Sequence, residues 1–214
     1  MTPRISFAAL LAAVAVTTTP ALAVDPPPAV APAAATAWIP PDHIARTKVY
    51  ILDGLNPLEM AGTWQLADRL QRAGFPHTKA GGWFMGWWYE REIRAAYAAD
   101  PTARFAIVGY SAGSYVARGM ANRLLRDGIP VAVVGYIGGD YLQDNPATRT
   151  PGAGRVVNIR GDGYLLTGRN LFFNGTDLTG ARNVRTPGVA HYGLPTHPTT
   201  FAVLYSALAA GDGE

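Results

Sequence analysis

The stretch that decides the fold runs from Arg104 to Arg126 and reads RFAIVGYSAGSYVARGMANRLLR. Its apolar, β-branched beginning, Arg104 to Tyr110, predicts a buried strand, and Ala112 to Arg126 has the pattern of an amphipathic helix. The junction Gly109 to Gly113 fits G-x-S-x-G. A strand before this motif and a helix after it are the context of a nucleophile elbow, so Ser111 is a candidate nucleophile.

The motif is unusual for a chain of this composition. With four Ser and 24 Gly, a random match is expected roughly 0.05 times, before any structural context is required. In so tight a turn, side chains at Gly109 and Gly113 would clash, and the serine oxygen is pushed out above the sheet. The alternative is a glycine-rich turn of a nucleotide-binding or purely structural sheet, but neither G-x-G-x-x-G nor G-x-x-x-x-G-K-[ST] occurs.

Strand and helix patterns alternate on both sides of this stretch. Further strands are predicted at 47–53, 76–80, 131–137, 155–159 and 183–185, and further helices at 58–73, 88–99 and 199–209. Such alternation predicts an α/β fold with about six mainly parallel strands and helices on both faces. Ligand sites of such sheets lie beyond the carboxyl ends of the strands, where the most interesting polar residues of this chain fall.

A nucleophilic serine needs an imidazole to take its proton. Among the four histidines, His191 lies in a glycine-containing loop after the last predicted strand and is the preferred base. His197 lies between Thr196 and Pro198, where it is expected to pack or cap the start of the last helix. The spacing of these two residues, with a proline between them, does not fit the one-face geometry of a helical metal site.

The acid that would orient the imidazole remains open on the residues alone. Asp140 follows the strand at 131–137, and Asp162 follows the strand at 155–159. Both are therefore expected at the reactive edge of the sheet. Asp177 lies in a long glycine-containing loop and is a third candidate, with turn stabilisation as its alternative role.

Two further segments follow strands at the same edge. After the first strand, Asp53-Gly54-Leu55 predicts a turn in which the N–H of Leu55, with that of Ala112, forms an oxyanion hole; an ordinary βα turn is the alternative. The segment 81–89 reads GGWFMGWWY. Its residues Trp83, Trp87 and Trp88 are predicted to wall an acyl-binding groove, with core packing as the alternative.

The composition limits what kind of protein this is. The 214 residues, of which 49% are hydrophobic and 15% charged, suit one ordinary domain and exclude wholesale disorder. Without cysteine there is no disulfide, no Cys-ligated metal site and no thiol nucleophile. The formal charge is +3, and the positive residues are scattered, which argues against a nucleic-acid partner.

The N-terminus has the pattern of a secretory signal over residues 1–23. Arg4 is followed by an apolar run, and Ala21-Leu22-Ala23 is a small-x-small cleavage site. We therefore expect an exported protein, periplasmic or secreted, without a stable membrane span after signal removal. Residues 24–45 are rich in Pro and Ala and are expected to be a flexible lead-in to a domain at 46–214.

With Ser111, an acid and His191 in this chain order, and the glycine turn at Leu55, the sequence from about residue 47 to 210 resembles the α/β-hydrolase superfamily in its esterase, lipase and thioesterase branch. The resemblance implies a three-layer sandwich that begins at the third strand of larger members and lacks a cap domain. Thioesterase-like members place the acid as Asp140 is placed here, and other members as Asp162 is.

The resemblance also implies an activity. A carboxylic ester or thioester would be cleaved through an acyl-enzyme on Ser111, without a cofactor, on a small-molecule or lipid-like acyl substrate. The alternative is a non-catalytic exported domain of the same fold that uses its aromatic loop to bind a partner.

Overall fold

The structure is a computed structural model and describes residues 46–55, 61–139, 150–163 and 176–211. Six parallel strands form one sheet in the order β2-β1-β3-β4-β5-β6. Their bounds are β1 Thr47–Leu52, β2 Thr78–Gly81, β3 Arg104–Tyr110, β4 Val133–Ile137, β5 Arg155–Gly161 and β6 Arg182–Thr186. Because all strands are parallel, their carboxyl ends meet at one edge of the sheet.

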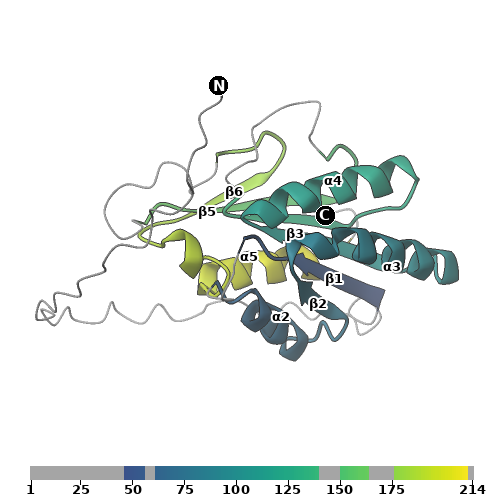
Figure 1. Ribbon diagram of the computed structural model, residues 1–214, viewed down its shortest axis with the longest axis horizontal. Helices are drawn as coiled ribbons and strands as arrows, with labels where there is room; N and C mark the ends of the chain where they lie inside the picture. Colours follow the sequence, from purple (N-terminus) through teal and green to yellow (C-terminus); the bar gives the residue numbers. More distant parts are fainter. Residues whose placement is uncertain (1–45, 56–60, 140–149, 164–175, 212–214) are drawn as a thin grey trace, which may run out of the picture. The chain divides into compact units, whose positions relative to one another are not determined.

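Helices cover both faces of this sheet (Figure 1). The helices are α2 Thr63–Arg72, α3 Gly86–Ala99, α4 Ala112–Arg126 and α5 Pro198–Ala209, with 3-10 turns η1 Trp83–Met85 and η3 His191–Gly193. Helices α3 and α4 pack on one face, and α2 and α5 on the other. Each helix is a crossover between parallel strands, except α5, which follows the last strand.

The core is divided by the sheet into two halves, as the strand period of two requires. Val49 and Ile51 of β1 point into the cluster that contains α2 and α5, whereas Tyr50 and Leu52 point into the cluster with α3 and α4. All four side chains are buried. Burial on both faces explains why the central strands read as nearly continuous apolar runs.

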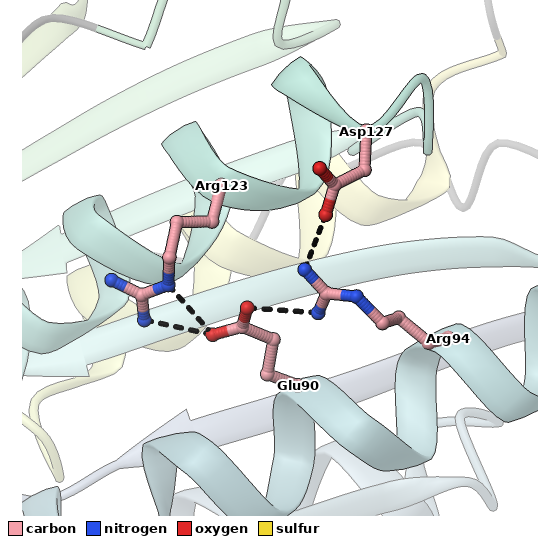
Figure 2. A network of polar contacts seen from close by, with 4 residues as sticks. All are labelled: Glu90, Arg94, Arg123 and Asp127. Carbon is pink, nitrogen blue, oxygen red and sulfur yellow. Dashed lines mark hydrogen bonds and ion pairs between the residues drawn. The ribbon is translucent and has the colours of Figure 1, made fainter.

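A polar network joins α3 to α4 on the outside of the second half (Figure 2). The buried carboxylate of Glu90 accepts hydrogen bonds from Arg123 Nε and Nη2 at 2.9 and 2.7 Å, and from Arg94 Nη1 at 2.8 Å. Arg94 also binds Asp127. Burial raises the pKa of Glu90, but the hydrogen bonds and charges of the two arginines outweigh it and hold this pKa below its ordinary value.

The predicted α/β class and the six-stranded parallel sheet are confirmed. Strand β3 and helix α4 have the predicted bounds, and most other elements begin or end within two residues of prediction. One boundary was wrong: the helix predicted at 58–73 is not continuous, since α2 begins at Thr63 and Gly62, with φ +72°, cannot belong to a right-handed helix. Residues 58–60 of that prediction lie outside the described residues. The predicted signal and lead-in lie outside the described residues.

Candidate active site

Ser111 lies at the junction of β3 and α4 in the conformation of an elbow. With φ 52° and ψ −125°, it is the only non-glycine residue of positive φ among the described residues. Its N–H donates to the carbonyl of Ile137 at 2.9 Å, and its own carbonyl accepts from Ser114 N at 2.9 Å. A non-glycine residue keeps this unfavourable backbone conformation only when surrounding contacts hold it there, as these two hydrogen bonds do. Residues strained in this way cluster at functional sites.

The glycines of the motif are sterically required, as predicted. A Cβ on Gly109 would lie 2.4 Å from Ser114 Cα, and one on Gly113 would lie 2.2 Å from the carbonyl oxygen of Leu52. Both obstacles are backbone atoms, so no side-chain movement relieves them. The absence of a side chain at Gly113 therefore lets the first turn of α4 pack directly against the end of β1.

The turn after β1 lies directly against this elbow. A Cβ on Gly54 would be 2.7 Å from Ser111 Cβ and 3.2 Å from Ala112 N. The Gly54 N–H donates to Asp53 Oδ1 at 2.8 Å, so the next N–H along the turn is that of Leu55, the predicted donor. The turn is thereby brought to the serine and to Ala112 at the start of α4, although Pro57 and the rest of the predicted βα turn lie outside the described residues.

Asp53 is the residue that holds this turn. Its buried carboxylate accepts from Gly54 N through one oxygen and from Thr63 Oγ1, at 3.0 Å, through the other. Thr63 is the first residue of α2 and is itself buried. Asp53 therefore fastens the turn behind β1 to the helix that follows it, a role that the sequence did not reveal.

His191 is brought to the same edge by the segment after β6. It begins η3, and only 6% of its surface is exposed. Its ring centroid lies 4.9 Å from that of Tyr110, the residue before Ser111. A Cβ on Gly138, at the end of β4, would lie 2.8 Å from His191 Nδ1. The imidazole of His191, which follows β6, therefore lies beside the end of β3 and the end of β4.

The second histidine has a different place. His197 precedes α5, and its Nδ1 accepts a hydrogen bond from Thr199 N at 3.2 Å. This is an N-cap of the last helix, which confirms the structural role predicted for it.

Of the two preferred candidate acids, the structure describes the surroundings of Asp162 but not those of Asp140. Asp140 lies outside the described residues, two positions after Gly138, which contacts the imidazole. Asp162 follows β5; its carboxylate accepts from Gly188 N at 2.6 Å and pairs with Arg185 Nη2 at 2.5 Å. The Gly188 hydrogen bond, aided by Arg185, lowers the pKa of Asp162.

Asp177, the third candidate, is an exposed side chain that pairs with Arg160 at 2.6 Å. The contacts of Asp162 therefore fasten the end of β5 to the segment leading to His191, and the ion pair of Asp177 fastens its loop to Arg160 of β5.

Four large aromatic side chains project from η1 and the first turn of α3, and we call them the aromatic tip. Trp83, Phe84, Trp87 and Trp88 are 44%, 70%, 64% and 56% exposed. Tyr89, next along the chain, is buried in the core. The core-packing alternative is therefore wrong for the three tryptophans.

The aromatic tip is close to the first turns of α4. A Cβ on Gly86 would lie 2.5 Å from Val116 Cγ1, five residues beyond Ser111. Tyr115 on α4 and Leu55 on the turn after β1 are exposed as well. Arg91 lies over the ring of Trp87, 4.8 Å from its centroid. Exposed apolar area of this kind beside a candidate site points to binding of an apolar ligand.

Among the described residues, no three His, Asp or Glu side chains are placed to hold a metal ion. None of the helices in that part of the chain has the length and apolar character needed to cross a bilayer.

Comparison with known proteins supports the fold. No family model matches the chain, and no curated protein matches it in sequence. Among solved structures, the product of gene lin2722 of Listeria innocua is 14% identical, with 79% of this chain and 96% of that chain covered and a TM-score of 0.55.

Two thioesterases are also found at lower TM-scores. The prodiginine-pathway thioesterase RedJ of Streptomyces coelicolor is 15% identical over 82% of this chain and 96% of that chain, with a TM-score of 0.45. The NocB thioesterase domain of the nocardicin cluster is 15% identical over 77% and 95%, with a TM-score of 0.43.

The class follows from the sheet and the site together. Parallel strands in the order β2-β1-β3-β4-β5-β6, a serine elbow after the third strand and a histidine after the sixth define the α/β-hydrolase fold. This chain has that fold.

Proposed function

We propose that the protein is a serine hydrolase that cleaves a carboxylic ester or thioester. The observation that carries this proposal is the backbone of Ser111, which is held at positive φ between two glycines that no other residue can replace. Strain of this kind is retained where a side chain must be presented to a substrate. A serine presented in this way at the carboxyl edge of a parallel sheet is suited to attack an acyl carbonyl.

The mechanism uses groups that meet at this edge. Ser111 Oγ attacks the acyl carbon while His191 takes its proton, and the N–H groups of Leu55 and Ala112 stabilise the negative oxygen of the tetrahedral intermediate. The bond to the leaving alkoxide or thiolate then breaks, and His191 returns the proton to it. Water, deprotonated by His191, attacks the acyl-enzyme, and the acid leaves as the Ser111 hydroxyl is restored.

We assign the orientation of the imidazole to Asp140. Gly138 lies against Nδ1 of His191, and Asp140 follows Gly138 by two residues. Nδ1 is the nitrogen that an orienting carboxylate binds when Nε2 takes the serine proton. Asp162 has its two carboxylate oxygens engaged by Gly188 and Arg185, which favours a supporting role.

The substrate we propose carries a long or bulky apolar acyl group. The aromatic tip, with Trp83, Trp87 and Trp88 as the predicted substrate-binding residues, lies beside the start of α4 and would cover such a group. Its exposure also favours a second function, a non-catalytic domain that binds a partner through the same side chains. The two functions differ in whether Ser111 is chemically activated.

A fluorophosphonate probe separates these two functions. Wild-type protein should be labelled rapidly, and mass spectrometry should place the label on Ser111. Ser111→Ala should abolish both labelling and hydrolysis of a panel of esters and thioesters of graded acyl length. Ser206→Ala, on the exposed side of α5, is the matched control and should label like wild type. Absence of labelling in wild-type protein would favour the binding function.

We further propose that the protein is exported, on the pattern of residues 1–23 alone. N-terminal sequencing of exported protein should give a chain that begins at Val24, and a chain that begins near Met1 would contradict this.

A further inference from the structure

Tyr110 links the elbow to the loop that carries His191. It is the residue between Gly109 and Ser111, and 1% of its surface is exposed. Its ring and the imidazole have centroids 4.9 Å apart and planes inclined by 31°, so the two rings are in contact in a tilted arrangement. The two residues are 81 positions apart in the chain.

A hydrogen bond adds to this ring contact. The Tyr110 hydroxyl donates to the backbone carbonyl of His191 at 3.3 Å, and the same carbonyl accepts from Leu194 N at 3.2 Å. One residue of β3 therefore contacts both the side chain and the backbone of His191. The hydroxyl holds the first residue of η3, and the ring limits the tilt of the imidazole that this residue carries.

Gly138 restricts the imidazole further. Its φ is +55°, and a Cβ there would lie 2.8 Å from Nδ1 and 2.9 Å from Cε1 of His191. The imidazole thus lies against the backbone of β4's end as well as against the Tyr110 ring. A ring confined in this way can change its distance to Ser111 only if one of these neighbours moves.

We propose that Tyr110 is a positioning residue that fixes the orientation of His191 toward Ser111; this inference rests on the proposed hydrolase function. A proton transfer requires heavy atoms within about 3 Å, and a misplacement of about 1 Å can cost about 10²-fold in rate. The aromatic face also favours the imidazolium that forms when His191 holds the proton. Because Tyr110 is buried, it does not reach the substrate itself and is a positioning residue rather than a catalytic one.

Two substitutions of Tyr110 distinguish the contribution of its ring contact from that of its hydroxyl hydrogen bond. Tyr110→Leu removes both contacts and should lower kcat for an acetyl ester about 10²-fold, with KM within about twofold of wild type. Tyr110→Phe keeps the ring and should restore most of kcat, leaving a loss of about three- to tenfold. Tyr136→Leu is the matched control, since Tyr136 is equally buried in the neighbouring strand but belongs to the other half of the core.

A spectroscopic measurement gives a second, activity-independent readout. The ring of Tyr110 should shift the Hε1 proton resonance of His191 upfield, and His191→Gln identifies that resonance among the four histidines. The shift should persist in Tyr110→Phe and disappear in Tyr110→Leu.

The outcomes are distinct. If Tyr110→Leu loses thermal stability as Tyr136→Leu does but keeps wild-type kcat, Tyr110 is only a core residue and this inference is overturned, while the hydrolase function stands. If wild-type protein neither turns over esters nor labels at Ser111, the proposed function fails and the inference fails with it. A lost kcat with unchanged KM, rescued by phenylalanine, supports both.

Discussion

The hydroxyl of Thr63 donates to Oδ2 of Asp53 across the ten residues that separate the end of β1 from the start of α2. Both side chains are buried, and the other carboxylate oxygen holds the N–H of Gly54, whose Cα faces the Ser111 side chain. The orientation of the proposed oxyanion donor at Leu55 therefore depends on a helix residue that does not itself belong to the turn.

The hydrogen bond between Thr63 and Asp53 predicts that a substitution of Thr63 lowers the rate of ester hydrolysis, although Thr63 lies outside the turn. Thr63→Val keeps the shape but removes the donor to Asp53, and turnover of a short-chain ester should fall about tenfold, less than the 10²–10³ of a lost oxyanion donor. Thr78→Val is the control, because it removes another buried hydroxyl bond, to the Phe75 carbonyl. Equal turnover of the two variants would show that the Asp53–Thr63 bond does not orient the turn.

The two carboxylates after β4 and β5 should differ sharply. Asp140→Asn removes the charge to which we assign the orientation of His191, and it should lower turnover by about 10⁴, the cost of this change in a serine protease. Asp162→Asn should cost less than about tenfold, because it keeps an acceptor for Gly188 and loses only the ion pair with Arg185. Turnover is measured with circular dichroism as the check on folding. The reverse ranking would transfer the acid role to Asp162, and two mild effects would leave Asp177 or a two-residue site.

Two glycines of α4 should respond oppositely to alanine. Gly113→Ala places a methyl group 2.2 Å from the Leu52 carbonyl and should destabilise the fold by about 3 kcal/mol or more. Gly119→Ala meets only the end of the Arg123 side chain, at 3.3 Å, and should stabilise by about 0.5–1 kcal/mol. Urea denaturation measures both. A Gly113→Ala protein as stable as wild type would mean that α4 can move away from β1.

The aromatic tip should affect substrate length rather than stability. Because Trp87 and Trp88 are more than half exposed, replacing both by alanine should leave the melting temperature nearly unchanged. Activity toward long-chain esters should fall at least tenfold more than activity toward acetyl esters, since each lost aromatic contact with a buried acyl chain costs about 1–3 kcal/mol. Equal losses at all chain lengths would remove the tip from the substrate site.

The network of Figure 2 predicts a stability effect that depends on pH. Glu90→Gln should cost about 1–3 kcal/mol at neutral pH, because it weakens the charged hydrogen bonds from Arg123 and Arg94. The pKa of Glu90 is lowered in the folded state. Its stabilisation is therefore complete above the unfolded pKa of about 4.3 and is lost as the pH falls through the lower folded value.

The measurement is the free energy of unfolding of both proteins between about pH 7 and pH 3. The difference between wild type and Glu90→Gln should shrink toward the acid end. Glu92→Gln, on the same helix, is the control: Glu92 pairs with the exposed Lys79, and such a surface pair should contribute about 1 kcal/mol or less. Glu92 also accepts a hydrogen bond from the Tyr50 hydroxyl at 3.2 Å, for which glutamine keeps an acceptor oxygen. A constant difference across the range would mean that the charge of Glu90 does not stabilise the fold.

The sequence predicts those parts of this molecule that depend on local pattern. The strand, turn and helix around Ser111 are contiguous, so their periodicities and glycines suffice, and parallel topology then brings His191 to the same edge. The start of α2 was missed because a single glycine is tolerated in a helical pattern, and only its φ reveals the break at Gly62.

Other features depend on tertiary packing that a linear pattern does not encode. The segment 83–89 is apolar all round, so nothing in its spacing separates buried Tyr89 from exposed Trp87 and Trp88. The second position of G-x-S-x-G accepts many residues, so Tyr110 carries no signal until His191 is placed beside it. Asp53 likewise gains its role only when Thr63 faces it.

The order of the strands has a consequence for the timing of folding. Ser111 follows β3, whereas His191 follows β6, which pairs only with β5 at the edge of the sheet among the described strands. A chain folded from its N-terminus through β5 would present the strained serine without its base, and the two meet only when the last strand docks. Long-range parallel pairing of this kind is slow to form. Activity should therefore appear abruptly, late in refolding, after most secondary structure has formed.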